Sequence, residues 1–235
     1  MTSKVEQPIT RPNLMRPECG LVAVSEWTVE TPERQRATVD AFAAAWANAP
    51  WPQGLLTCSL LCGNDGRSIV IYGQWTNEES YRSGLETHLR PRAALVDQKV
   101  PGIVRSAPDF YRLHRSRLRD TAAFPGCIVL ITFEFESPDH ERQKQFISNV
   151  FRVIDGMPVQ AEGAIGGHFH ASMDGLRVLN FAEWANEASH RQAIEGPSRL
   201  GSGPDWESVR KFPGLHASHF QRFTLGLNLA PPSQD

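Results

Sequence analysis

The chain has 235 residues, of which 40% are hydrophobic and 21% are charged, and its formal net charge is −2 at pH 7. This composition is typical of a soluble globular protein, and the near-neutral charge argues against a nucleic-acid or membrane partner. The four cysteines are too few and too irregularly spaced for a disulfide framework, which predicts reduced thiols and a cytoplasmic location.

The amino-terminal stretch carries three prolines among polar residues, so we expect a flexible arm over 1–17. The arm lacks the apolar centre of a signal peptide, and no later run is long enough to predict a membrane span. The folded part of the chain is therefore expected to begin near residue 18.

Residues 18–114 predict six elements in the order β-α-β-β-α-β. Thr31-Pro32-Glu33 marks the first helix start, because it offers a capping hydroxyl, a proline tolerated in the first turn and an acid favoured by the helix dipole. Thr76 and Glu79 match a capping box that opens a second helix, which we expect to break at Arg90-Pro91 before a further turn. Strands are expected over 20–27, 55–62, 68–75 and 110–114.

A connector over 115–124 leads to residues 125–229, where the same order of elements returns. Ser137-Pro138-Asp139 repeats the helix start, and Asp174-Gly175 repeats the hairpin turn predicted at Asp65-Gly66. Strands are expected over 127–135, 165–172, 177–184 and 219–225, a second helix is expected from Asn186, and the tail over 230–235 is expected to fray.

An internal repeat relates the two regions. Residues 75–82 and 184–191 share the pattern W-x-N-E-x-S-x-R at an offset of 109 residues. Each region has the order of a ferredoxin-like unit, whose sheet carries helices on one face and leaves an apolar face bare. Two copies can cover each other's bare faces. We therefore predict an α+β fold in which two ferredoxin-like βαββαβ repeats form an intrachain pseudo-dimeric α+β barrel.

On these features the sequence resembles the antibiotic biosynthesis monooxygenase family, within the dimeric α+β barrel superfamily. The resemblance is carried by 163–175, by the strand into Glu183-Trp184, by the helix start Asn186-Glu187, and by the equivalent stretch 54–82. It covers residues 19–114 and 125–228.

The resemblance implies a cavity between sheet and helices and a monooxygenase that oxidises a polycyclic phenolic or anthrone-like substrate with O2, in aromatic polyketide biosynthesis. It implies either no required cofactor or a diffusible reduced flavin, delivered by a flavin reductase. The alternatives are a non-oxidative cyclase, a metabolite-binding protein of the same fold, and a haem-handling protein with a second-repeat histidine as axial ligand. Pairing of the chain into a homodimer is left open.

Two histidines distinguish the second repeat from the first. His168 and His170 replace Ser59 and Leu61, and alternation along a strand places both on one face. A histidine can act as a general base near neutral pH, as removing a phenolic proton requires, so both are candidate catalytic residues. The alternatives are ordinary hydrogen bonding, or a metal site completed by His216 or His219. No metal is expected in the first interpretation.

Asn180 and Trp184 share a strand face, and the counterpart of Asn180 in the first repeat is Ile71. A buried amide needs partners, so Asn180 is a third candidate catalytic residue that would hold a carbonyl or reduced oxygen. Trp184 offers a flat surface and an N–H donor to an aromatic substrate, although a tryptophan kept in both repeats suits a core position equally well. The remaining candidate substrate-binding residues are Phe169, Phe181, His190 and Arg222.

Overall fold

Eight strands close into an antiparallel barrel in the computed structural model, which describes residues 10–47, 49–157, 161–196 and 200–231. Going round the barrel, the strand order is β3-β2-β9-β6-β8-β7-β5-β1, and pairing of β1 with β3 closes the ring. The two-residue strand β4 (Val104–Arg105) pairs with β1 outside this ring. The barrel strands are β1 (Leu21–Thr28), β2 (Leu55–Gly63), β3 (Ser68–Trp75), β5 (Asp109–Leu118), β6 (Cys127–Phe135), β7 (Ala164–Ser172), β8 (Arg177–Trp184) and β9 (Leu215–Leu229).

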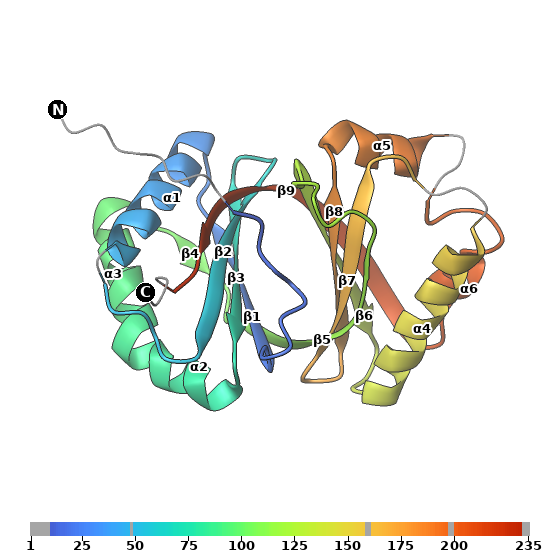
Figure 1. The fold of residues 1–235 in the computed structure, drawn as a ribbon, viewed down its shortest axis with the longest axis horizontal. Helices are drawn as coiled ribbons and strands as arrows, with labels where there is room; N and C mark the ends of the chain where they lie inside the picture. Colours follow the sequence, from blue (N-terminus) through green and yellow to red (C-terminus); the bar gives the residue numbers. More distant parts are fainter. Residues whose placement is uncertain (1–9, 48, 158–160, 197–199, 232–235) are drawn as a thin grey trace.

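Each half of the barrel is a ferredoxin-like sheet, as the repeat predicts. The first half has the order β2-β3-β1-β5 and the second has the equivalent order β7-β8-β6-β9. Helices cover the outer face of each sheet, so the two bare faces meet inside the barrel (Figure 1). The helical segments are α1 (Pro32–Trp46), α2 (Glu78–Gly84), η1 (Leu85–Leu89), α3 (Arg90–Lys99), α4 (His140–Gly156), α5 (Glu187–Glu195) and α6 (Glu207–Arg210).

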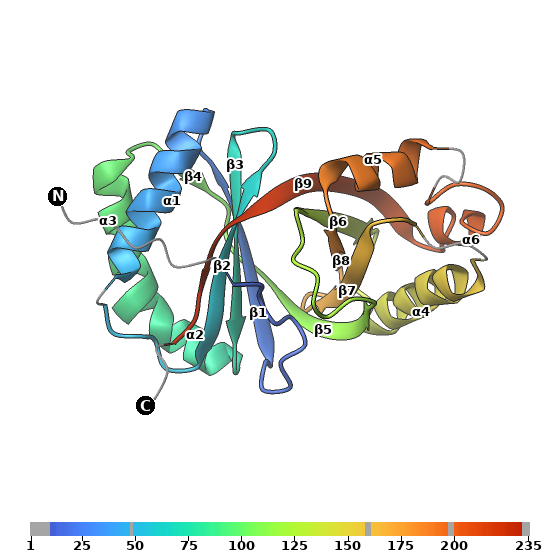
Figure 2. The ribbon, with the colours of Figure 1, turned by 45° about the horizontal axis from the view of Figure 1, so that its top comes forward.

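The last strand of each half crosses to the other half (Figures 1 and 2). β9 pairs with β6 over 215–223 and with β2 over 223–229, and β5 pairs with β1 and then with β7. Both strands are longer than predicted, and residues 115–118 belong to β5 rather than to the connector. The local sequence could not show the extensions over 115–118 and 226–229, because these residues pair with strands of the other repeat.

Helix starts follow the expected capping chemistry, with changes in position. Thr31 caps α1 as predicted, whereas the caps of α2 and α4 are Asn77 and Asp139 rather than Thr76 and Ser137. The Asn77 side-chain oxygen accepts the backbone N–H of Ser80, and the Asp139 carboxylate accepts that of Arg142. The predicted break at Arg90-Pro91 is also wrong, because the π-helical segment η1 joins α2 to α3 without interruption.

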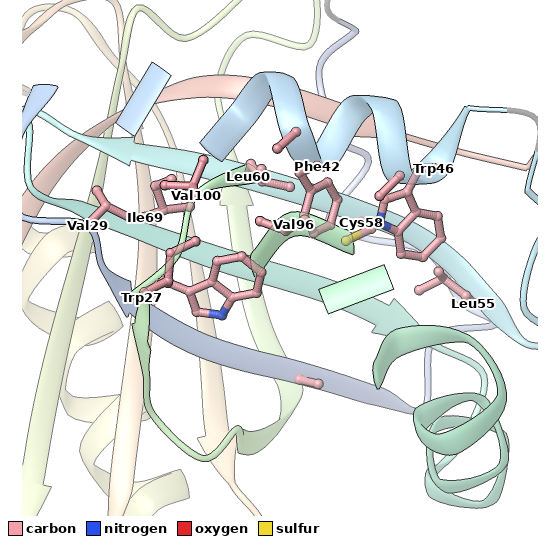
Figure 3. Close-up of a cluster of buried hydrophobic side chains, with 14 of the residues drawn as sticks. Trp27, Val29, Phe42, Trp46, Leu55, Cys58, Leu60, Ile69, Val96 and Val100 are labelled. Carbon is pink, nitrogen blue, oxygen red and sulfur yellow. The ribbon is translucent and has the colours of Figure 1, made fainter. Parts of the chain in front are cut away.

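Three apolar layers hold the molecule together. The barrel interior contains Tyr72 and Phe181, from opposite halves, with their ring centroids 5.3 Å apart. The first outer layer lies between the first sheet and helices α1 and α3 (Figure 3), and it is rich in tryptophan, including Trp27 and Trp46. The second outer layer packs α4 and α6 on β7 and β8 through residues such as Phe146.

The described part of the amino-terminal arm, residues 10–17, is fixed against the barrel rather than loose. Arg11 donates to both carboxylate oxygens of Glu183, and Leu14 is buried in the barrel interior. The rest of the predicted arm and most of the predicted tail, 1–9 and 232–235, lie outside the described residues. No helix in the described part of the chain is long and apolar enough to span a membrane.

Candidate functional site

The two candidate catalytic histidines point into the barrel, side by side on β7 as alternation predicts. Both are essentially inaccessible, with 2% exposure for His168 and none for His170. Strand register explains their position, because His168 lies opposite Phe181 on β8 and therefore shares the inward face with it. Phe181 is likewise buried in the barrel interior.

Each of these histidines has both ring nitrogens occupied. His170 donates from Nδ1 to the carbonyl of His168 and accepts the Tyr72 hydroxyl at Nε2, both at 2.9 Å. His168 donates from Nε2 to Glu183 at 3.1 Å, and its Nδ1 lies 2.9 Å from the Ser116 hydroxyl. Burial, followed by the neighbouring His168, lowers the pKa of His170 to about 3, so this imidazole is neutral.

Asn180 and Trp184 lie on the opposite face of the same sheet, toward the helices. Asn180 is opposite Phe169 in the β7–β8 ladder, so these two side chains share the outer face. The expectation that one pocket brings His168 and His170 together with Asn180 is therefore wrong. A molecule bound on the helix side of this sheet contacts Asn180 and cannot reach either imidazole, because the sheet itself separates them.

A cavity of about 100 Å³, here called the second-half chamber, lies between β7, β8 and helix α4. Its wall includes Arg117, Phe151, Phe169, Asn180 and Trp184. The side-chain oxygen Oδ1 of Asn180 is buried and has no hydrogen-bond partner among the residues that the structure describes. Gly167 faces this amide, since a Cβ added there would lie 3.5 Å from Oδ1, which leaves room for a ligand beside it.

The last two predicted binding residues, His190 and Arg222, contact each other beside Trp184. Arg222 donates from Nε to His190 Nδ1 at 2.9 Å, and the His190 ring packs edge-on against Trp184 at 5.1 Å. Burial, followed by the Arg222 charge, lowers the pKa of His190 to about 4. His190 packs against Trp184. Neither His190 nor Arg222 is part of the chamber wall that the described residues form.

A second and larger cavity, of about 240 Å³, occupies the equivalent place in the first half. This first-half cavity lies between the first sheet and helices α1 to α3, and Trp27, Trp46 and Trp75 line it together with Tyr81. The sequence pattern did not predict this cavity, because the residues that differ between the repeats, His168, His170 and Asn180, indicated a ligand in the second repeat. The available signal was the concentration of tryptophans at 27, 46, 51 and 75.

Neither cavity offers a histidine or carboxylate along the walls formed by described residues. The same part of the chain contains no group of three or more His, Cys, Asp and Glu side chains placed to hold a metal ion. His216 and His219 are exposed on β9, so they do not join the two barrel histidines. Axial ligation of haem by His168 or His170 would require breaking hydrogen bonds that now occupy both nitrogens.

A closed barrel of two ferredoxin-like halves, each with a cavity under its helices, defines the chain as a dimeric α+β barrel protein. This is the fold implied by the resemblance to the antibiotic biosynthesis monooxygenase family. No protein-family model and no curated protein matches the sequence itself.

Solved structures with the same fold include proteins described as monooxygenases or as anthrone oxidase-like. An anthrone oxidase-like protein superposes with a TM-score of 0.66 at 12% identity, covering 89% of this chain and 92% of its own. A proposed monooxygenase of Fusobacterium nucleatum gives 0.57 at 8% identity, covering 92% and 96%. Another, from Lactobacillus acidophilus, gives 0.56 at 8% identity, covering 89% and 96%. At these identities the likeness establishes the fold alone.

Proposed function

We propose that the protein is an oxygenase that uses O2 to oxidise a polycyclic phenolic, anthrone-like substrate of aromatic polyketide biosynthesis in the second-half chamber. The observation that carries the proposal is the buried, unpartnered Oδ1 of Asn180 beside Trp184. An unsatisfied buried polar atom costs about 1–3 kcal/mol, a cost that a substrate hydroxyl would remove. The fold shared with an anthrone oxidase-like protein supports the same class of chemistry.

The chamber favours a substrate that enters as an anion. Arg117 and Arg119 line its wall, and Arg117 is already paired with Asp155, so Arg119 is the guanidinium left to attract an anion. No described carboxylate or histidine on this wall could take a proton. We therefore assign substrate ionisation to the substrate's own acidity beside the Arg119 guanidinium, in place of a histidine base. Trp184 supplies a flat surface for the rings.

The oxidation balances without an electron donor other than the substrate. The carbanion form of an anthrone-like CH2 centre transfers electrons to O2 and forms a C–O bond, giving a peroxide anion. Protonation of the peroxide and loss of water leave a carbonyl at that carbon, so one O2 yields one carbonyl and one water. Where the substrate anion is too weak a reductant, a diffusible reduced flavin from a reductase would supply the electrons.

The chamber must enlarge when such a substrate binds. Its volume of about 100 Å³ is well below the roughly 300 Å³ at which small-molecule sites usually begin. Its outer wall includes Met157 and Leu200, side chains borne on segments outside the barrel strands. Movement of this wall on binding is therefore part of the proposal.

Oxygen uptake by the purified protein with an anthrone tests the proposal. Replacing Asn180 with Leu keeps the side-chain size and removes the amide, so kcat/KM should fall by roughly a hundredfold. Asn149→Leu, which changes a half-buried amide on α4 outside the chamber, is the matched control and should keep wild-type uptake. Uptake that Asn180→Leu leaves intact would remove this chamber from the reaction.

The same assay distinguishes a flavin-dependent oxygenase from a cofactor-independent one. It also distinguishes an oxygenase from a protein that binds or cyclises the substrate without oxidising it. Uptake that begins only when a flavin reductase and reduced flavin are added would favour the flavin-dependent version. Tight binding of the anthrone, with no oxygen consumed under either condition, would favour a metabolite-binding protein or a non-oxidative cyclase.

A further inference from the structure

The first-half cavity is lined by a buried arginine that has no counter-ion in the described part of the chain. Three arginines line this cavity, and two of them have carboxylate partners: Arg90 pairs with Glu86 at 2.6 Å and Arg105 with Asp97 at 2.8 Å. Arg92 is only 6% exposed, and its one hydrogen bond among the described residues is to the Pro50 carbonyl at 2.5 Å.

Two donors on side chains that line this cavity have no acceptor within the described ranges. Arg92 Nε and Trp46 Nε1 are both buried and unpartnered, although the Arg92 guanidinium stacks 4.3 Å above the Trp46 ring. Burial lowers the pKa of Arg92 from its ordinary high value, which reflects the same unfavourable desolvation. A buried charge that has no counter-ion, and whose donors are only partly matched by acceptors, is unfavourable.

The remaining wall is mainly apolar and aromatic, with Ser25 and Ser106 as its polar members. Trp27, Trp75, Tyr81 and Phe42 surround the space, and no described aspartate or glutamate lines it. A flat apolar body would pack against these rings, while an anionic group at its end would accept from Arg92 and Trp46.

We propose that the first-half cavity is a second ligand site, separate from the oxygenase chamber, which binds a small aromatic carboxylate or phenolate with Arg92 as its counter-ion. The size of the occupant is limited, because 240 Å³ is slightly below the usual range of small-molecule sites, roughly 300 Å³ and more. A molecule of one or two rings therefore fits this site better than a larger polycycle.

Isothermal titration of the full chain with 2-naphthoate and with neutral naphthalen-2-ylmethanol tests the proposal. These probes share the ring system and differ in charge, so the wild-type protein should bind 2-naphthoate about tenfold more tightly or better. Arg92→Met should abolish this preference while still binding the neutral probe. Arg82→Met, which removes an exposed arginine paired with Glu78, should keep the preference.

A second variant covers the case in which Arg92→Met does not fold. Ala93 lines the cavity from α3, and Ala93→Phe should fill the space and weaken binding of both probes. Equal affinity of the wild type for the two probes would overturn the proposal. A preference that survives Arg92→Met, or binding that survives Ala93→Phe, would do the same.

A variant in the second-half chamber distinguishes the second ligand site from the proposed oxygenase site. Asn180→Leu should leave 2-naphthoate binding unchanged, because the two cavities lie in different halves. Loss of 2-naphthoate binding in Asn180→Leu would place the anion in the oxygenase chamber and overturn the second site. The melting temperature of Arg92→Met should equal or exceed that of the wild type, since an unpaired buried charge is removed.

Discussion

Some buried polar side chains in this protein have hydrogen-bond partners for all their polar atoms, and others do not. His168, His170 and Glu183 form a connected network inside the barrel with no unpartnered nitrogen or oxygen. Asn180 and Arg92, at the wall of a cavity, each keep a buried atom that no described residue bonds. A satisfied network stabilises one packing arrangement, whereas an unsatisfied group gains free energy when a ligand arrives.

The neutral histidines make the fold sensitive to acid. The pKa of His170 is about 3 and that of His190 about 4, against 6.5 in the unfolded chain. The unfolded chain therefore binds more protons below pH 6.5, and the free energy of unfolding falls as the pH drops. Each histidine contributes up to about 1.4 kcal/mol per pH unit, down to about pH 4 for His190 and pH 3 for His170.

Urea unfolding between pH 6.5 and 5 measures this slope. His170→Leu should reduce the slope by about one proton, and adding His190→Leu should remove a second. Ile147→Val destabilises the outer layer and keeps both imidazoles, so it should shift the midpoint and leave the slope unchanged. An unchanged slope in the double histidine variant would show that other groups govern acid unfolding.

At the scale of elements, the described arm residues close one end of the barrel. Arg11 also donates to the carbonyls of Asp120 and Ala123, so it ties the arm to the connector as well as to Glu183. The pKa of Glu183 is lowered: burial raises it, but hydrogen bonds from His168 and Arg11 outweigh this effect. The carboxylate is therefore ionised inside a nearly inaccessible site.

Removing the arm's charge should cost a large part of the stability. Arg11→Met leaves a buried carboxylate with only His168 as partner, which should lower the free energy of unfolding by about 3 kcal/mol. Arg36→Met, at an exposed pair with Glu33, should change it by less than about 1 kcal/mol.

Chemical denaturation of Arg11→Met, and of the double variant Arg11→Met with Glu183→Gln, measures the effect. The double variant should recover part of the loss, because the unpaired charge is gone. A single variant as stable as Arg36→Met would mean that the Arg11–Glu183 pair adds nothing to the stability of the barrel.

The elements themselves were predictable because their signals are local. β3, β6 and β8 have the predicted bounds, since each is an apolar run ended by a turn or a cap. The continuous junction of α2 and α3 was not predictable from local signals. A proline at residue 91 indicates a break unless the preceding turn widens into a π-helix, as it does here. The lengths of β5 and β9 depend on partners more than forty residues away in the chain.

The site required more than the strand pattern. Alternation correctly grouped His168 with His170 and Asn180 with Trp184, but it could not say whether the two groups shared a face. That depends on register: β7 pairs Phe169 with Asn180, which puts the histidines on the other side of the sheet. A slip of one residue would have reversed the result. The unpaired Arg92 was equally invisible, because its lack of a counter-ion is a property of the packed structure.

For the whole molecule, the exchange of last strands makes each half dependent on the other. β2 pairs with β9 and β5 pairs with β7, and the apolar face of each sheet is buried only against the opposite face. A single half would expose this face together with unpaired strand edges. The two halves should therefore not exist as folded monomers.

Cutting the chain between residues 119 and 126 tests this dependence. The two fragments, expressed separately, should self-associate or aggregate, and together they should form a one-to-one complex of the size of the intact chain. Leu61 is inaccessible in the barrel interior, so Leu61→Glu in the first fragment should prevent this assembly, whereas Arg36→Met should not. Light scattering with circular dichroism reports both mass and folding. A folded monomeric fragment would mean that either sheet can be stable with its inner face in water, and the barrel would then be a docking of independent domains.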